Sequence, residues 1–468
     1  MDKMLPKDVS ELNAAISEME EFRNPAYRGS MENYRSLMEG INALHEVEKY
    51  DVVFIGEPGM GKTTTICTWL GLVRKDPEGL KSPESAMLLS VRQGRTTVAE
   101  VRIRQVEGRS RILLEYGTIE AQTAMIRNYC SYYYGKFIHA AAEEEDEEDG
   151  ATEEDVHSEV DRVIRNMARL SSIPSEDDER FGKIRECLEK LGSFEAFFET
   201  VMDRIDLEER DLSEIGFDGS DSFERWLSKT FEDINNGKNP RCAIADTITI
   251  EVGREDRDLR LPDYVGDVID TKGLDTSARM DLQDLMTSDS TVVIFMDRIN
   301  NVPSKTNRAL VKKTYLGEEY RPYAMKTLMF VRATDDELAA VNEAEGDPEL
   351  GKENKINEFD RKKESENVLL YSRNVLFVDS HSPFETVSFM EKDEAGKLKK
   401  RTRITGYNDA VAEAFREQVQ GGISSAIGFL RESLEEDADR IRENVEALMV
   451  LEEDYENTCG AEELDRIC

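Results

Sequence analysis

Apolar positions divide the chain into segments with the spacing of helices and segments with the spacing of strands. The first 48 residues carry apolar side chains at helical spacing. The run Asp51–Ile55 is short, rich in β-branched residues and bounded by Gly56, as in a buried strand of a parallel sheet. Helical stretches separate most of the later strand-like runs, which predicts an α/β fold with a mainly parallel sheet. These later runs are Val98–Val106, Ile112–Tyr116, Asp246–Val252, Val265–Ile269, Thr291–Met296, Thr327–Val331 and Asn374–Val378.

Two long helical stretches depart from this alternation. Residues 117–239 are acidic and almost wholly helical in pattern, which predicts a helical insertion into the α/β domain. From about Asn408 the pattern is helical again, with an expected interruption at Gly421-Gly422. The predicted units are an N-terminal helical segment (1–48), an α/β domain split between 49–116 and 240–400, the acidic helical insertion (117–239) and a C-terminal helical segment (401–468).

The strongest chemical signal is a phosphate-binding loop directly after the first predicted strand. The residues Gly56-Glu57-Pro58-Gly59-Met60-Gly61-Lys62-Thr63 match the P-loop pattern GxxxxGK[ST], and a helix is predicted over Thr64–Leu72. The glycines let successive backbone N–H groups surround a phosphate chain, and the helix N-terminus adds positive potential. Lys62 reaches the β- and γ-phosphates, and Thr63 can bind Mg²⁺. The fold that we expect is therefore that of a P-loop NTPase. Thr64, at the start of the predicted helix, is also expected to contact the nucleotide.

A P-loop needs a second, acidic element to position magnesium. The apolar run Val265–Ile269 leads into Asp270-Thr271-Lys272-Gly273, a DxxG sequence at the end of a predicted strand. An aspartate in that place can contact Mg²⁺ directly or through water, and the glycine N–H can bond a γ-phosphate. Asp270 is the expected magnesium residue and Gly273 an expected nucleotide contact. Aspartate and glycine are also common turn residues, which is the alternative interpretation.

A threonine-bearing loop, Gly94-Arg95-Thr96-Thr97, lies between these two motifs and precedes an alternating strand. The order of P-loop, threonine loop, strand and DxxG resembles the GTPase branch of P-loop proteins, in particular its dynamin-like and septin-like (TRAFAC) members. The resemblance covers about 50–105 and 246–382. It implies that Thr96 or Thr97 is the switch I residue that closes over Mg²⁺ and the γ-phosphate, and it does not choose between them. A threonine-rich strand start is the alternative interpretation.

The resemblance is incomplete at the base-recognition motif, normally [NT]KxD. The candidate here is Arg332-Ala333-Thr334-Asp335, in which only the aspartate is retained. A carboxylate at Asp335 can accept both guanine N–H donors, which favours GTP. The stretch from Thr334 to Glu337 equally resembles a helix N-cap. Asp379-Ser380-His381 stands where the family's last base-contacting loop would be.

The water-positioning glutamine of Ras-like switches is also missing, because Leu274 follows Gly273. Catalysis would then need another group to offset the charge that develops on the phosphate. Lys272 and Arg279 are the nearest cations in the sequence.

Two other nucleotide-binding classes remain open. The string GxPGxGKT also occurs in AAA-type and signalling ATPases, which generally carry a glutamate directly after the Walker B aspartate. The best alternative Walker B strand ends at Asp297 and is followed by Arg298, and Thr271 follows Asp270. The missing glutamate favours the GTPase branch over the ATPase. The third class is a pseudo-NTPase that binds nucleotide structurally, against which the intact Lys62, Thr63 and Asp270 argue.

The amino-acid composition limits the classes of partner that the chain is expected to bind. The chain has 468 residues, with 61 Lys and Arg against 99 Asp and Glu, for a net charge of −38. So acidic a chain is a poor match for nucleic acid or anionic lipid. Six cysteines without CxxC spacing and four histidines predict neither a disulfide framework nor a zinc site, and they fit a reducing cytoplasm. No apolar run reaches transmembrane length.

We expect a magnesium-dependent nucleotide hydrolase that acts as a conformational switch, with GTP preferred to ATP. The threonine loop and residues 270–275 are expected to be ordered by the γ-phosphate, and the helical insertion or the C-terminal helices to bind a protein partner. The resemblance implies self-association. It does not extend to membrane remodelling, because no hydrophobic paddle or basic stretch stands out. Such switches also occur in multi-protein bacterial complexes, including defence systems.

Overall fold

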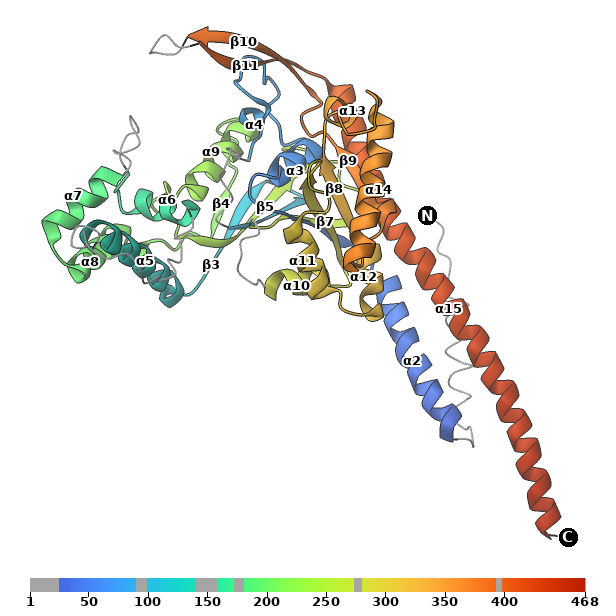
Figure 1. The fold of residues 1–468 in the computed structure, drawn as a ribbon. Coiled ribbons are helices and arrows are strands. Elements are labelled where there is room, and N and C mark those ends of the chain that lie inside the picture. Colours follow the sequence, from blue (N-terminus) through green and yellow to red (C-terminus); the bar gives the residue numbers. More distant parts are fainter. Residues whose placement is uncertain are drawn as a thin grey trace.

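The computed structural model describes residues 25–89, 99–139, 158–171, 181–272, 280–392 and 398–467. It has a mixed α/β fold built on a large, mostly parallel sheet of nine strands, with helices on both faces (Figure 1). A fold of this kind is consistent with a P-loop NTPase. All eight strands predicted from the sequence are present, with bounds that differ by one or two residues. None of the described helices is both long enough and apolar enough to cross a lipid bilayer.

The strand order is β4-β3-β5-β2-β6-β1-β7-β8-β9. Strands β6, β1, β7, β8 and β9 run parallel, as do β2 and β5, whereas β2 is antiparallel to β6, and β3 is antiparallel to both β4 and β5. The strands are β1 (Tyr50–Ile55), β2 (Glu100–Val106), β3 (Arg111–Tyr116), β4 (Glu214–Gly216), β5 (Ala245–Gly253), β6 (Val265–Asp270), β7 (Thr291–Arg298), β8 (Thr327–Arg332) and β9 (Val375–Val378).

Alternate residues of β1 enter different cores. Val52 and Phe54 pack against helices on one face, and Val53 and Ile55 pack against helices on the other. Burial on both faces explains why β1 reads as a continuous apolar run in the sequence. The first face is covered by α3 (Lys62–Leu70), α9 (Phe223–Asn235) and α15 (Asp409–Ile467), and the second by α10 (Met280–Met286), α11 (Lys305–Thr314), α13 (Asp335–Ala339) and α14 (Pro348–Glu366). Two short helices complete this body, α4 (Pro83–Ala86) and α12 (Arg321–Met325).

Helices between β3 and β4 enclose an apolar core of their own. Tyr133, Ile164, Leu188 and Phe197 are buried in it, one from each helix. Residues spaced three and four apart share a helix face, so each helix presents an apolar stripe to this core. The helices are α5 (Ile119–Tyr134), α6 (Ser158–Met167), α7 (Gly182–Leu191) and α8 (Phe194–Ile205).

The segment 117–239 is not only helical. The short strand β4 adds to the edge of the sheet beside β3, and α9 packs on the face of the sheet. In α9, Phe223, Leu227 and Phe231 are buried against the main core and not against the core of α5–α8. A strand of three residues is too short to show an alternating pattern.

The C-terminal region differs from its prediction in two ways. Residues 401–407 belong to β11 (Leu398–Tyr407), which pairs with β10 (Phe384–Lys392) in a separate antiparallel hairpin. The helix starts at Asp409 and continues through Gly421 and Gly422, so the predicted interruption is wrong. A Cβ on Gly422 would lie 2.5 Å from a methyl carbon of Leu376, so glycine here lets the helix approach β9 closely.

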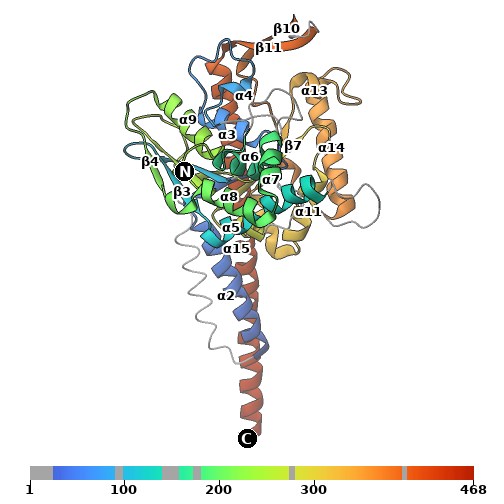
Figure 2. The ribbon, with the colours of Figure 1, turned by 90° about the vertical axis from the view of Figure 1, so that its left-hand side faces the viewer.

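Helix α2 (Pro25–His45) lies along α15 and extends with it away from the body (Figures 1 and 2). Met31 and Met38 of α2 are buried against Ile441 and Val445 of α15. The described part of the predicted N-terminal helix is therefore helical. The rest of that prediction, residues 1–24, lies outside the described residues.

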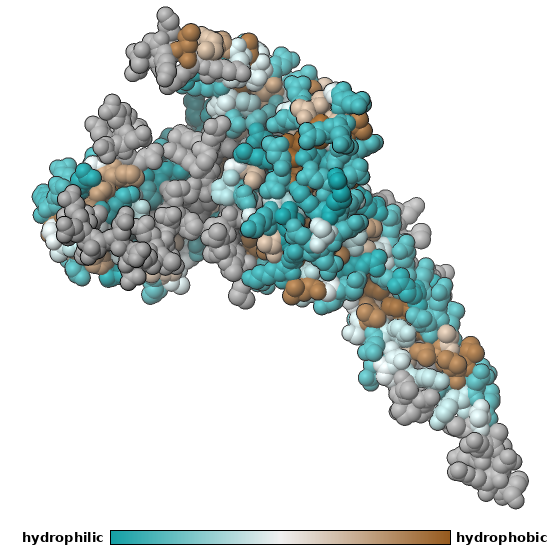
Figure 3. Space-filling view, viewed as in Figure 1, coloured by the Kyte–Doolittle hydropathy of each residue, from teal (hydrophilic) through white to brown (hydrophobic). Residues whose placement is uncertain are grey.

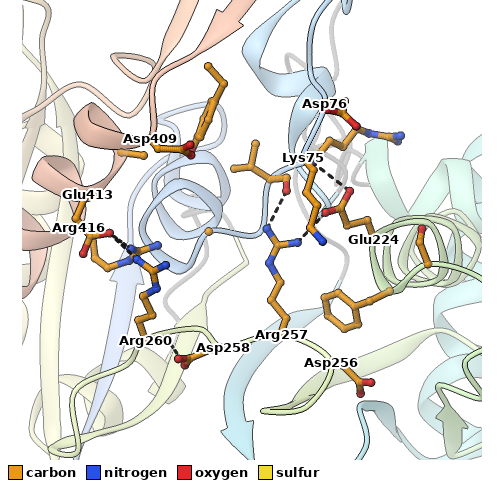
Figure 4. A pocket seen from close by; sticks show the side chains of 17 residues that line it. Lys75, Asp76, Glu224, Asp256, Arg257, Asp258, Arg260, Asp409, Glu413 and Arg416 are labelled. Carbon is orange, nitrogen blue, oxygen red and sulfur yellow. Dashed lines mark hydrogen bonds and ion pairs between the residues drawn. The ribbon is translucent and has the colours of Figure 1, made fainter.

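A charged cavity of about 1000 Å³ lies where the C-terminal end of α3 meets the β5–β6 loop and the start of α15 (Figure 4). Arg416 is buried there. Its Nε donates a hydrogen bond of 3.1 Å to the carbonyl of Trp69, in the last turn of α3, and its guanidinium pairs with Glu413. Arg260 pairs with the same Glu413 from the solvent side, at 2.8 Å. Arg416 therefore joins the P-loop helix to α15.

We expect Arg416→Ala to lower the melting temperature by a few degrees, because it leaves the Trp69 carbonyl without its charged donor, at a cost of about 1–3 kcal/mol. Arg260→Ala is the matched control, since it removes the exposed partner of the same carboxylate. A thermal melt of both variants checks the prediction, and equal losses would contradict a special role for Arg416.

Candidate functional site

The P-loop connects β1 to α3 at the carboxyl edge of the sheet. Its backbone needs glycine, because Gly59 and Gly61 have φ angles of 76° and 93°, in the left-handed region. Gly56 lies so close to β7 that a Cβ there would stand 3.0 Å from the Met296 carbonyl oxygen. Lys62 is the first residue of α3, so the free N–H groups of that helix start at the loop.

Lys62, Thr63 and Asp270 come together at this edge. Asp270, the last residue of β6, pairs in register with Phe54 of β1, which brings it level with the start of the P-loop. The Thr63 hydroxyl donates a hydrogen bond to Asp270 Oδ2, and Lys62 Nζ donates one of 2.9 Å to the Gly56 carbonyl. Both Lys62 and Asp270 are buried, with exposed fractions of 6% and 1%. Two motifs 207 residues apart in the sequence thus form one site.

The carboxylate of Asp270 is only partly satisfied. Its Oδ1 is buried and accepts no hydrogen bond. Burial raises the pKa of Asp270, while the Lys62 ammonium and the Thr63 hydroxyl oppose that rise. A buried carboxylate oxygen beside a threonine hydroxyl supplies the hard oxygen donors that Mg²⁺ prefers, with room left in its shell for phosphate and water. The residues present therefore fit a magnesium ion.

The start of β2 faces the same place. Because β2 runs antiparallel to β6, its first residues lie at the edge where β6 ends, and Val101 stands directly opposite Asp270. The first residues of β2 therefore lie beside Asp270. The threonines of the predicted switch I, Thr96 and Thr97, lie outside the described residues, as do Gly273 and Arg279.

Three further side chains contact the P-loop from the β7 side. Arg298 donates a hydrogen bond of 3.2 Å to the Gly59 carbonyl, and the Thr306 hydroxyl of α11 donates to the Glu57 carboxylate. Arg332 lies against Gly61, where a Cβ would stand 3.7 Å from its guanidinium. Sequence reasoning missed these roles. The sequence does carry one sign of these contacts, because β7 and β8 each end in an arginine. The two strands are neighbours and pair in register at Arg298 and Arg332.

Asp297, the alternative Walker B residue, has a structural role. Its carboxylate accepts hydrogen bonds of 2.8 Å from the Ser304 N–H and from the Asn307 amide, which fixes the loop before α11. Burial raises its pKa to about 7. Both oxygens are thus occupied, unlike those of Asp270, so the geometry favours Asp270 as the residue for a metal.

Asp335 is the first residue of α13, directly after β8, and its side chain is exposed. The sequence had suggested a helix cap here, and a capping box is present: Thr334 accepts from the Glu337 N–H at 3.2 Å, and Glu337 accepts from the Thr334 N–H at 2.9 Å. The cap therefore does not use the Asp335 carboxylate. The side chain stands at the carboxyl edge of the sheet, where α/β folds bind ligands.

The loop after β9 contacts the P-loop helix. The Ser380 carbonyl accepts a hydrogen bond of 3.0 Å from the Thr68 hydroxyl of α3. His381 lies 3.3 Å from the carboxylate of Glu84 in α4, and burial lowers the pKa of this histidine. The predicted last base-contacting loop is therefore beside α3, on the same edge as the P-loop.

Lys272 is one of the two cations predicted to assist catalysis. Its Nζ lies 3.9 Å from Asp246 Oδ1, at the start of β5. Asp246 lies in β5, so this partner and the arginines of β7 and β8 that contact the P-loop are on opposite sides of β2 and β6 in the sheet.

Comparison with known proteins gives little further guidance. No family model matches the chain, and no curated protein matches it. Two solved structures are similar over 98% of the chain, with 12% and 10% sequence identity and TM-scores of 0.35 and 0.36. Both are described as an oligomerised bacterial dynamin pair that provides a mechanism for the long-range sensing and tethering of membranes. The chain spans 58% and 49% of their lengths, and likeness at this level identifies neither family nor activity.

Proposed function

We propose that the protein is a magnesium-dependent nucleoside triphosphatase that works as a switch and prefers GTP to ATP. The observation that carries the proposal is the contact between Thr63 and Asp270, with Asp270 Oδ1 left without a hydrogen-bond partner and Lys62 beside it. A turn rich in glycine by chance has no reason to face a buried, partly satisfied carboxylate, which is costly without a ligand.

Each of the described site residues has a proposed role in binding or hydrolysis. The backbone of the P-loop and the N-terminus of α3 bind the phosphate chain, and Lys62 offsets its charge. Thr63 and Asp270 would hold Mg²⁺, which supplies electrostatic stabilisation of the transferring phosphoryl group. Arg298 and Thr306 hold the loop in place through Gly59 and Glu57. Their fixed positions limit reorganisation during the reaction.

Switching is proposed at the two segments that flank Asp270. Thr96 or Thr97 would close over the γ-phosphate, supported by Val101 standing opposite Asp270, and residues 270–275 would respond beside it. The helical insertion and α15 are the proposed readers of the change. For α15 the support is the hydrogen bond that Arg416 makes to the last turn of α3.

The test is phosphate release from GTP and from ATP by the full chain, with Mg²⁺ and with EDTA. We expect release that requires Mg²⁺ and is faster with GTP. Release from ATP alone would assign the chain to the ATPase class, and binding without release would assign it to the pseudo-NTPases.

Base preference is tested separately at Asp335. A carboxylate can accept the N1–H and the 2-amino group of guanine, and a site built on paired bonds discriminates strongly. We expect Asp335→Asn to weaken GTP binding by about tenfold or more and to shift preference toward xanthine nucleotides. Competition binding with GTP, XTP and ATP checks this. Asp336→Asn, one residue along the same helix, is the control, and unchanged preference in Asp335→Asn would remove the support for guanine.

A further inference from the structure

The β10–β11 hairpin projects from the body of the protein (Figures 1 and 2). Its residues from Glu385 to Met390 are all exposed, although three of them are large and apolar. Phe389 is 38% exposed, and Met390 and Leu398 are each 58% exposed. Figure 3 shows apolar atoms on the surface of this hairpin, at the upper left. A two-stranded ribbon without a covering layer is marginally stable in water, so this exposure calls for a partner.

The hairpin is also basic in a chain that is otherwise strongly acidic. Strand β11 contains four lysines and arginines and no acidic residue, while the whole chain has a net charge of −38. This basic stretch of four residues was not among the features predicted from the sequence. Arg401 and Arg403 are exposed and pair across the ribbon with Phe389 and Val387. Arg403 lies over the Phe389 ring at 5.8 Å, so cationic and apolar groups share one face.

Both faces of the ribbon combine apolar and cationic side chains. Val387 and Phe389 alternate with Ser388 and Met390, so each face presents apolar side chains. An amphipathic element that lies on a lipid surface has one apolar face and one polar face. Nucleic acid is disfavoured by the net charge of −38 on the whole chain, which repels phosphate. A ribbon with apolar and cationic side chains on both sides suits a protein surface that carries negative charge.

A complementary surface stands at the same edge of the sheet. Residues 336–351, here called the acidic segment, contain six Asp and Glu, all exposed, and no Lys or Arg. This segment follows the end of β8, and the hairpin follows the end of β9. Since β8 and β9 are parallel neighbours, both surfaces leave the sheet at one edge.

We propose that the protein self-associates by a reciprocal exchange in which the hairpin of one copy binds the acidic segment of a second copy. The two surfaces are opposite in charge and lie at the same edge of one molecule, so a two-fold axis forms two equal contacts and closes the dimer. The exposed apolar residues of the hairpin become buried in each contact. The proposal does not depend on the nucleotide chemistry proposed above.

Charge reversal tests the exchange directly. One full-length variant carries Arg401→Glu and Arg403→Glu, and the other carries Asp336→Lys, Glu343→Lys and Glu345→Lys, three acidic positions that do not cap a helix. Each homodimer then opposes like charges in both contacts, so analytical ultracentrifugation should show dimerisation weakened by about tenfold or more. An equal mixture restores opposite charges in both contacts, so we expect a heterodimer close to wild type in affinity.

Phe389→Ser gives a second measurement that leaves charge unchanged. It should weaken wild-type dimerisation, whereas Leu316→Ser, at a site 76% exposed on another part of the surface, should not. Thermal melts show whether each variant is folded. Three results would overturn the proposal: a wild-type chain that stays monomeric up to about 100 μM, a mixture that fails to restore the dimer, or a hairpin that binds vesicles or nucleic acid as a monomer.

Discussion

Replacing Lys62 by alanine is expected to reduce kcat/KM for nucleotide hydrolysis by about 100-fold or more, because the side chain acts as a charge on phosphate. Lys62 is buried beside Asp270, and its ammonium opposes the rise in the pKa of that carboxyl. Its removal therefore raises the pKa of Asp270 further. Phosphate release measures the loss of activity, and a thermal melt shows whether the variant is folded.

Lys229→Ala is the matched control for this variant, since it removes an exposed lysine of α9 that pairs with Asp233. We expect full activity in the control and a folded but inactive Lys62→Ala protein. Hydrolysis at the wild-type rate in Lys62→Ala would mean that the reaction takes place elsewhere.

Asp270→Asn should lower magnesium-dependent turnover by on the order of 100-fold. Nucleotide affinity should persist in part, because the P-loop backbone and the α3 N-terminus are unchanged. The amide keeps the shape of the side chain but is a poorer metal ligand. Titration of Mg²⁺ against the rate of hydrolysis checks the prediction, and wild-type magnesium dependence in Asp270→Asn would contradict it.

Stability gives an independent readout for the same variant. Burial raises the folded-state pKa of Asp270 above its unfolded value, so the protonated form is favoured in the folded state. The contribution of Asp270 to the free energy of unfolding is greatest at low pH. It is lost as the pH rises from the pKa of this group in the unfolded state to its higher pKa in the folded state. Asparagine imitates the protonated form. We therefore expect Asp270→Asn to melt no lower than wild type at pH 8 without magnesium, as suits a residue retained for function.

Sequence alone predicted the framework of the site because its signals are local. The run Asp51–Ile55 is apolar because β1 is buried on both faces, and the glycines of the P-loop mark backbone that other residues rarely adopt. The strand ending at Asp270 was identified in the same way. The structure adds that Asp270 meets Thr63, a contact set by the pairing of β6 with β1.

The features that were missed depend on contacts between distant segments. Arg298 and Arg332 reach the P-loop only because β7 and β8 pair in register beside β1. Gly422 predicted a helix break, yet it lies within α15, where the missing side chain admits Leu376 of β9. Local propensity cannot report such packing. The exposure of the hairpin was missed for the same reason. Its alternating pattern does not reveal that residues from Glu385 to Met390 lack a covering layer, whereas Ile404 at its base is buried.

Calorimetric binding of a non-hydrolysable GTP analogue to the full chain, with Mg²⁺ and with EDTA, tests the central claim most directly. If Thr63 and Asp270 hold a metal between the P-loop and the phosphates, Mg²⁺ must strengthen triphosphate binding in wild type and have little effect in Asp270→Asn. We expect this difference, and we expect GDP binding to depend less on Mg²⁺ than binding of the triphosphate does. Equal affinity for the analogue with and without Mg²⁺ in the wild-type chain would contradict it.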